Sequence, residues 1–334
     1  MSTPVALPPM PSTVYHYCTV ETFFNIVKNH TLRLSDIEKS NDFMEKKWAI
    51  QKCLEYIRSN LEDPAYPCSQ KPELSKQLLH SMEQQFHTYN MMILACCFSS
   101  ERDLLSQWRG YGDNGCGVCI GIDASRQFFP AYQRTRQYFC SPQSAHNLPS
   151  NLCFHNIQYG AEDIQQIVMN LFSTFLNWLP LSITIEQAAY TLVRIIYPAL
   201  PFFKSNAFSE EAEWRCVFFP QLPAPPYENL TFDESAFHNL LEQQKKSISL
   251  DSFTLLPLQY RLRQSNLVPY RDLSFDSNVI VSDHQYDYVP DNFIRSVTLG
   301  PKCQLDRETV KVLLELNNIP IELKNIYLSD VSYR

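Results

Sequence analysis

The sequence predicts an α+β fold in which helices flank a central sheet that is mixed or antiparallel. Short β-rich segments, such as Val14 to Cys18 and Glu213 to Phe219, are spread along the whole chain. Segments with apolar residues at helical spacing separate them, as between Trp48 and Leu61. Strands and helices do not alternate regularly, so the pattern differs from a parallel sheet built of βαβ units.

The first half of the chain opens with a strand, a helix and a second strand. Val14 to Cys18 is the first expected strand, and Thr19 follows it where a helix N-cap belongs. Residues 31–35 alternate apolar and polar side chains and predict the second strand. Beyond them we expect helices over 48–61 and 74–89, a strand over 91–99, a short helix over 102–109 and a strand over 115–123.

The second half has a less regular pattern, and residues 124–150 show none. We expect a strand at 156–159, helices over 162–177 and 184–198, strands over 213–219 and 294–299, a helix over 306–317 and a strand over 319–328. The proline-rich residues 220–226 are typical of a linker or of a surface loop. The proline-rich residues 1–12 predict a flexible lead-in, and residues 13–334 a single domain.

Composition and charge exclude several classes of partner. The 334 residues include 28 Lys and Arg against 35 Asp and Glu, a formal net charge of −7. Binding to nucleic acid in general needs a dense basic surface, so it is not expected. The apolar residues 171–203 are interrupted by Asn177, Pro180 and Glu186, so no membrane span is expected. The N-terminus lacks the basic and apolar regions of a signal peptide, which predicts a cytoplasmic protein or one delivered without a conventional signal.

The 11 cysteines are scattered, and only Cys116 and Cys119 form a CxxC pair. No second CxxC and no paired histidine spacing completes a zinc site. We therefore expect reduced, mostly buried cysteines, with neither disulfides nor zinc holding the fold.

Five of the seven glycines lie between Arg109 and Asp123. They include a formal GxGxxG, but it follows an expected helix and opens a strand, the reverse of a dinucleotide-binding turn. Two interpretations remain open. The segment is either a plain helix-to-strand turn with its tip at 113–115, or a loop that presents Trp108, Arg109, Tyr111 and Asp113 at the edge of a cleft.

The segment from Lys204 to Arg215 holds a pair of carboxylates. If Glu213 starts a strand, Glu211 and Glu213 point to the same side and can hold sugar hydroxyls. A solvated acidic loop is the alternative. Other polar groups on expected strands are His16 and Tyr17, Arg33 with Ser35, and Ser99, which lacks the GxSxG context of a serine hydrolase.

These pieces occur together in one known family. In chain order they are the His16-Tyr17 strand, Leu34-Ser35, Cys97-Phe98-Ser99, Gln107-Trp108 through Tyr111, Glu211-x-Glu213-Trp214-Arg215 and Gly300-Pro301. The chain resembles the bacterial domain-of-unknown-function family two-nine-seven-one, over roughly residues 14–330. That family name carries no activity.

A more remote likeness is to the ADP-ribosyltransferases, and it implies an ADP-ribosyltransferase-like fold and an enzyme that consumes NAD as its substrate. Glu213 is then the catalytic carboxylate, Glu211 its partner, and His16 orients the NAD. Tyr111 or Trp108 stacks on nicotinamide, and Tyr17, Arg33, Ser99 and Arg215 complete the nucleotide-binding residues. Such an enzyme, of toxin, defence or effector type, transfers ADP-ribose to a macromolecule or hydrolyses NAD. We expect these residues to line one cleft.

Two other classes of function stay open. A non-catalytic binding module in defence or host interaction would use Trp108 and Trp214 as core residues and pair Arg215 with Glu211 or Asp113. A metal-dependent hydrolase or nuclease would use Glu211, Glu213, Asp113 and His16, but no metal-ligand spacing such as HExxH supports it, and no metal is expected.

Overall fold

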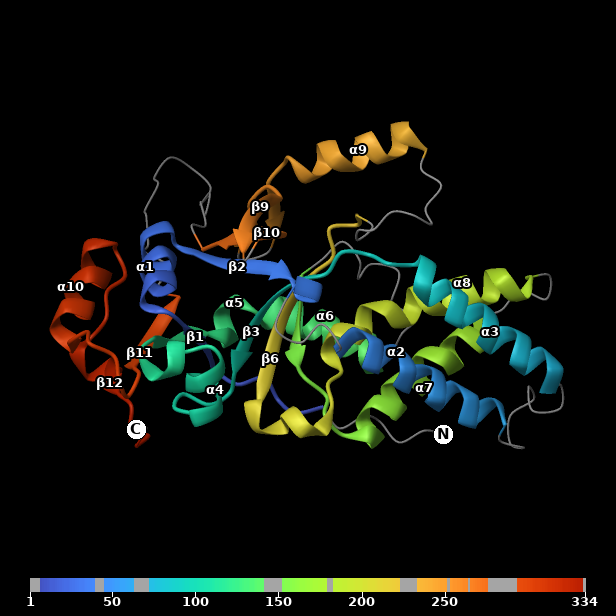
Figure 1. Cartoon of the computed structure of the whole chain (residues 1–334), viewed down its shortest axis with the longest axis horizontal. Helices are drawn as coiled ribbons and strands as arrows, with labels where there is room; N and C mark the ends of the chain where they lie inside the picture. Colours follow the sequence, from blue (N-terminus) through green and yellow to red (C-terminus); the bar gives the residue numbers. More distant parts are fainter. Residues whose placement is uncertain are drawn as a thin grey trace, which may run out of the picture.

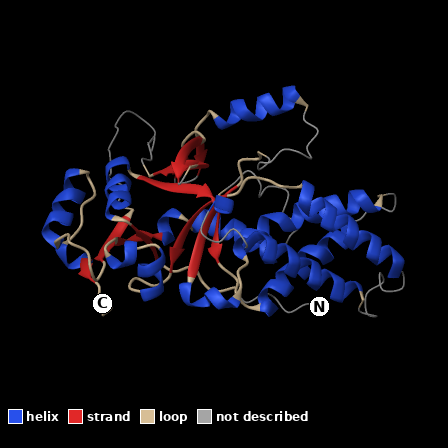
Figure 2. Ribbon diagram, in the orientation of Figure 1, coloured by secondary structure: helices blue, strands red, loops and turns tan. Residues whose placement is uncertain are grey.

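The computed structural model describes residues 7–39, 45–62, 72–140, 152–178, 183–222, 233–250, 253–263, 265–275 and 293–332. Within these ranges helices surround a large sheet, so the predicted α+β fold is confirmed (Figure 1; Figure 2). Among the described residues every strand pair is antiparallel except β11 (Ile294–Leu299) with β12 (Ile326–Leu328). The other strands are β1 (Thr13–Cys18), β2 (Thr31–Asp36), β3 (Leu94–Ser99), β4 (Val118–Asp123), β5 (Cys153–Asn156), β6 (Glu213–Phe218), β7 (Ile248–Leu250), β8 (Phe253–Leu255), β9 (Gln259–Arg263) and β10 (Asn266–Ser274).

The sheet forks at β3. One edge of β3 pairs with β6, while its other edge is shared by two strands. Ala95 pairs with Ser35 of β2 near one end, and Ser99 pairs with Tyr15 of β1 at the other. Residues 96–98 therefore have no strand partner on this edge in the described part of the chain. One arm continues through β1, β4, β11 and β12, and the other through β2 and β10.

Helices pack on this sheet in two groups. The helices α2 (Glu45–Leu61), α3 (Pro72–Thr88), α7 (Ala161–Trp178) and α8 (Ile185–Ile196) pack on one another to one side (Figure 1). At the opposite end α1 (Val20–Asn29) and α10 (Arg307–Leu316) flank the arm of β4 and β11. The remaining helices are α4 (Leu105–Gly110), α5 (Ala124–Gln127), α6 (Phe129–Cys140) and α9 (Glu234–Gln244).

The core follows the same division. One apolar cluster gathers the inward side chains of β1, β2, β4 and β11, including Val14, Leu34, Ile120 and Val297. A second cluster fills the space among α2, α3, α7 and α8. Strand β6 joins them, because alternate residues along a strand face opposite sides: Cys216 lies in the first cluster and Val217 in the second.

The predicted opening of the chain is confirmed. Strand β1, helix α1 and strand β2 lie where expected, and the Thr19 hydroxyl caps α1 by accepting a hydrogen bond from the Thr22 amide at 3.1 Å. The expected helices and strands between residues 45 and 123 are present, as are those at 161–178, 185–196, 213–218, 294–299 and 307–316.

Other elements differ from the prediction. Helix α6 occupies part of the segment for which the sequence predicted no element. The sequence did not reveal this helix because the polar residue Thr135 lies within its buried face and interrupts the apolar periodicity. Strand β5 starts earlier than expected and β12 is shorter. Two residues of the expected lead-in contact the fold: Leu7 is buried, and the Tyr132 hydroxyl donates to the Pro8 carbonyl at 2.9 Å. Residues 141–150 and 223–226 lie outside the described residues.

The ten cysteines that the structure describes are all free, and six of them are buried. Cys116 is exposed and Cys119 buried, so the CxxC spacing does not bring two thiols to one surface site. The six buried cysteines act as small apolar residues, as the sequence predicts.

Candidate functional site

Two adjoining hollows open where the sheet forks, and we refer to them together as the central cleft. Their cavity volumes are about 460 Å³ and about 440 Å³, within the range of ligand-binding pockets. They share eight lining residues, Thr19, Ser35, Ala95, Cys97, Tyr111, Glu213, Arg261 and Arg263. The second hollow is also lined by His16, Arg33 and Glu211, so much of the predicted site meets in one place.

A buried ion network forms the floor of the central cleft. Nζ of Lys204 lies 2.8 Å from Glu45 Oε1, 2.6 Å from Glu211 Oε2 and 3.2 Å from Glu213 Oε2. Arg215 contacts the same group through Glu213 Oε1 at 2.7 Å and Glu45 Oε2 at 3.1 Å. Three carboxylates therefore face two cations, which leaves one net negative charge beside the cleft.

The local backbone holds the two glutamates of the Glu211-x-Glu213 pair together. Glu213 starts β6 as predicted, but Glu211 ends a short 3₁₀ helix (Asn206–Glu211) and does not belong to the strand. Between them Ala212 adopts the left-handed conformation, with φ 46°, and this turn directs both carboxylates to Lys204. Ser99 supports the turn from β3, since its hydroxyl donates to the Glu211 carbonyl at 2.9 Å.

Burial and ion pairing set the charge state of the network. Burial raises the pKa of Glu211 above the ordinary carboxyl range, and Lys204 only partly offsets it. Burial acts the same way on Glu45, but there Arg215 and Lys204 outweigh it and hold the pKa low. Burial would lower the pKa of Lys204, yet the surrounding carboxylates raise it. Both cations therefore stay charged, and Glu211 takes up a proton more readily than Glu45.

His16 reaches into the fork between β1 and β3. Its Nδ1 lies 3.0 Å from the Cys97 carbonyl oxygen, a group that only accepts, so Nδ1 carries the proton. Burial lowers the pKa of His16, and the ring is neutral at pH 7. Its Nε2 is then a hydrogen-bond acceptor on a residue that lines the central cleft.

Tyr111 is the exposed aromatic residue of the cleft. Its side chain is 42% exposed and lines both hollows. It follows α4 directly, and the predicted turn comes next, with positive φ at Asp113, Asn114 and Gly115. Of the residues expected at this edge, Arg109 and Asp113 also line the cleft. Both interpretations of the glycine-rich segment are thus compatible with its geometry.

Trp108 lies in the core, not at the cleft. It is fully buried, its indole nitrogen donates to Asp103 Oδ1 at 2.6 Å, and its ring packs edge-on against Tyr17 at 4.8 Å. This corrects its expected position, because a fully buried ring has no face left to stack on a ligand. Tyr17 lines the cleft, but its hydroxyl is hydrogen-bonded to the backbone: it donates to the Glu101 carbonyl and accepts from the Leu104 amide.

The remaining predicted residues take different positions. Arg33 lines the cleft and pairs with Asp272 of β10 at 2.8 Å. Ser99 is fully buried and acts on the cleft only through the Glu211 turn. Arg215 lines the first hollow and contacts Glu213 and Glu45, rather than the partners Glu211 or Asp113 of the binding-module interpretation.

Sequence reasoning did not assign several cleft residues. Lys204 opens the segment singled out from the sequence, but its role depends on contacts that no local pattern reveals. Glu45 comes from α2, far from Lys204 along the chain. Arg261 and Arg263 come from β9, a strand that was not predicted.

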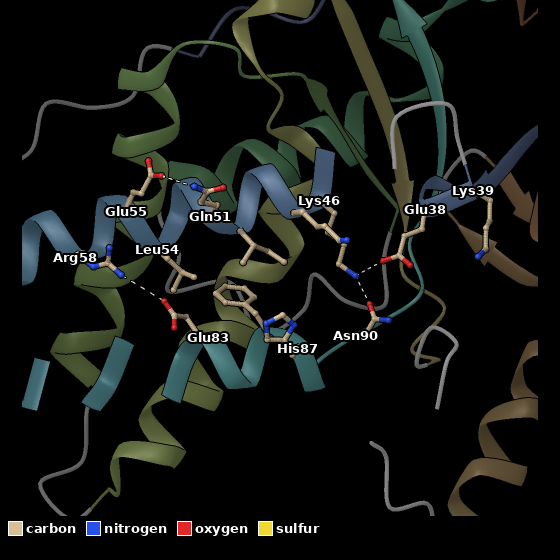
Figure 3. Close-up of a pocket in the computed structure, with 13 residues that line it drawn as sticks. Glu38, Lys39, Lys46, Gln51, Leu54, Glu55, Arg58, Glu83, His87 and Asn90 are labelled. Atoms are coloured by element: carbon tan, nitrogen blue, oxygen red, sulfur yellow. Dashed lines mark hydrogen bonds and ion pairs between the residues drawn. The ribbon is translucent and has the colours of Figure 1, made fainter. Parts of the chain in front are cut away.

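A further hollow of about 760 Å³ lies between α2 and α3 (Figure 3). Its floor is apolar, with Ile50, Leu54 and Phe86. Charged groups on its rim pair with one another, as Arg58 does with Glu83 at 3.7 Å. Its lining contains none of the residues that the sequence singled out for chemistry, so the central cleft is the candidate site.

Neither metal nor membrane features stand out in the described ranges. No group of three or more His, Cys, Asp or Glu side chains there has an arrangement that could hold a metal ion. Between Glu45, Glu211 and Glu213 the ammonium of Lys204 takes the central place. None of the described helices is both long and apolar enough to cross a bilayer.

Comparison with known proteins finds a family match in the central part of the chain. No curated protein and no solved structure matches it. Residues 107–216 match the family model described as "Protein of unknown function (DUF2971)". The match is shorter than the expected 14–330, and it includes Tyr111, Glu211 and Glu213 but not His16. Over these residues the chain is similar to the DUF2971 family, the family that its motifs predict.

Proposed function

We propose that this protein consumes NAD at the central cleft, by transferring ADP-ribose to a macromolecule or by hydrolysing NAD. One observation carries the proposal: His16, Tyr111, Glu211 and Glu213, which come from distant parts of the sequence, line the same hollow. These are the residue types that the resemblance to ADP-ribosyltransferases assigns to substrate orientation, stacking and catalysis.

The charge distribution suits a nucleotide. Among the described residues that line the two hollows, seven are Lys or Arg and five are Asp or Glu, in a chain whose formal charge is −7. Cations at the rim suit phosphate groups, and carboxylates at the floor suit ribose hydroxyls. The exposed ring of Tyr111 offers a face for nicotinamide.

The proposed reaction breaks the bond between nicotinamide and ribose. The bonding electrons leave with nicotinamide, which departs neutral, so no general acid is needed. The ribose carbon becomes oxocarbenium-like and bonds to water, which loses a proton, or to a nucleophile of an acceptor. Glu213 is positioned by Arg215 and Lys204 to stabilise that positive charge, while Glu211 holds a ribose hydroxyl or takes the proton of the attacking group.

A non-catalytic binding module is the second candidate, and one observation favours it. Both carboxylate oxygens of Glu213 already have cationic partners, so part of its charge is used within the protein. Release of nicotinamide from NAD by the purified protein separates the two functions. Release supports the enzyme, and ligand binding without release supports the module.

A further inference from the structure

Three arginines lie together along one wall of the central cleft. Arg33 comes from β2, and Arg261 and Arg263 come from β9. All three line the hollow that also contains Glu211 and Glu213. Burial lowers the pKa of Arg261, the positive charges of Arg33 and Arg263 lower it further, and Asp272 only partly offsets them. Arg261 is therefore close enough to both arginines to be repelled by them.

Arg33 and Arg261 differ in how the protein compensates their charge. Arg33 forms a bidentate ion pair with Asp272, from Nε to Oδ1 at 2.8 Å and from Nη2 to Oδ2 at 3.0 Å. Arg261 donates to the Ser35 hydroxyl at 3.3 Å, which supplies no charge. Its Nε is buried and has no hydrogen-bond partner within the described part of the chain. A buried donor without an acceptor costs free energy, so the Arg261 guanidinium lacks part of the compensation that Arg33 has.

The β9–β10 hairpin turns its arginines toward the cleft. Side chains alternate along β9, so Arg261 and Arg263 share one face while Tyr260 and Leu262 share the other. Tyr260 and Leu262 are 53% and 74% exposed, and neither lines the cleft. The hairpin therefore places the side chains of Arg261 and Arg263 at the cleft.

We propose that Arg261 and Arg263, supported by Arg33, form a subsite for the diphosphate of a dinucleotide. Guanidinium groups bind phosphate oxygens by paired hydrogen bonds, and two of them on alternate positions of a strand suit two adjacent phosphates. A ligand held there reaches Glu213, because Arg261, Arg263 and Glu213 line the same two hollows. The identity of the ligand as NAD rests on the proposed function, whereas the diphosphate chemistry rests on the arginines.

Isothermal titration of the full chain with inorganic pyrophosphate, ADP-ribose and NAD tests the subsite. We expect Arg261→Gln and Arg263→Gln each to weaken binding of pyrophosphate and of ADP-ribose about 10-fold, the weight of one charge-assisted hydrogen bond. Arg261→Lys keeps the charge but not the paired geometry, so it should weaken binding less, by about 3-fold. Leu262→Gln on the outer face of β9, and Arg136→Gln on α6, should bind like the wild type.

The outcomes separate the subsite from the proposed function. If pyrophosphate does not bind, or binds equally to wild type and to both arginine variants, the subsite is wrong, even if NAD is cleaved. If pyrophosphate binding depends on the two arginines but NAD releases no nicotinamide, the subsite stands and the proposed function fails. A thermal melt of each variant identifies loss of folding. If Arg261→Gln does not fold, the binding affinity of Arg261→Lys is compared with that of the wild type instead.

Discussion

The ammonium of Lys204 lies 2.8 Å from Oε1 of Glu45, and this contact joins the helical side of the fold to the floor of the cleft. Glu45 begins α2, whereas Lys204 precedes the 3₁₀ helix that leads to Glu211. The pair therefore couples the position of the catalytic candidates to helix packing.

Lys204→Met should destabilise the protein strongly. The Lys204 side chain is only 3% exposed, and its removal leaves three carboxylates with Arg215 as their remaining cation. Loss of one partner of a buried ion pair costs about 3–5 kcal/mol of unfolding free energy. Urea denaturation at pH 7 measures the change. Lys245→Met, in an exposed pair with Glu242, is the control and should have little effect; equal stability of both variants would contradict the network.

Ala212→Gly should be neutral or slightly stabilising. Ala212 has φ 46° and ψ 47°, a conformation that costs a residue with a Cβ about 1 kcal/mol and glycine nothing. The same change at the exposed Ala236, in the first turn of α9, should instead destabilise, by up to about 1 kcal/mol. Thermal melts compare the two variants. A loss of stability in Ala212→Gly as large as that in Ala236→Gly would argue against the left-handed turn.

The stability of the wild type should fall as pH rises through 6 because of Asp36. Burial raises the pKa of Asp36 to about 6 in the folded state, against about 4 in an unfolded chain. The folded state therefore binds the proton more tightly, and this contribution is lost between about pH 4 and about pH 6. Asp36→Asn, which still accepts from the Glu38 amide, should gain about 2 kcal/mol relative to wild type between pH 4 and pH 8. Urea denaturation at the two pH values checks this, and a constant difference would contradict it.

Tyr111→Ala should weaken use of NAD without unfolding the protein. Its ring is 42% exposed at the cleft, and the loss of one stacked ring corresponds to about 3- to 10-fold in affinity. Tyr111→Phe should keep most of the affinity, because the ring remains. Tyr260→Ala removes a comparably exposed ring from the outer face of β9 and is the control. Equal effects at both positions would mean that Tyr111 has no particular role at the cleft.

The sequence predicted the strands that carry the candidate site, because their apolar runs are local signals. Glu213 starts β6 as the run from Trp214 to Phe218 indicates. The proximity of Glu211 to Glu213 was also expected, but as two alternate residues on one face of a strand. It comes from the left-handed Ala212 and the shared contact with Lys204, not from alternation along a strand.

The contacts that complete the cleft had no local signal. Glu45 meets Lys204 only because α2 packs beside the 197–202 segment. The residues of β9, Gln-Tyr-Arg-Leu-Arg, are mostly exposed, so no apolar stripe identifies the strand. Trp108 shows the reverse error: a tryptophan beside a glycine-rich turn suggested a binding surface, yet burial of its large apolar ring in the core is the more favourable arrangement.

Glu213→Gln gives the central comparison, with one complication from the network. Glutamine keeps the size of the side chain but not its charge, so the reaction barrier should rise by roughly 3–4 kcal/mol, about 10²–10³-fold in rate. It also leaves Arg215 with one carboxylate fewer, so the variant should melt at a lower temperature. Glu211→Gln, with Lys204 as its cationic partner, is the milder second variant.

The most direct test is nicotinamide release from NAD by the purified wild type and by Glu213→Gln, at a temperature where circular dichroism shows both to be folded. The account predicts release by the wild type and a rate at least about 100-fold lower for the variant. No release by the wild type with water or a mixture of cellular proteins as acceptor, or equal rates for the two, would contradict it.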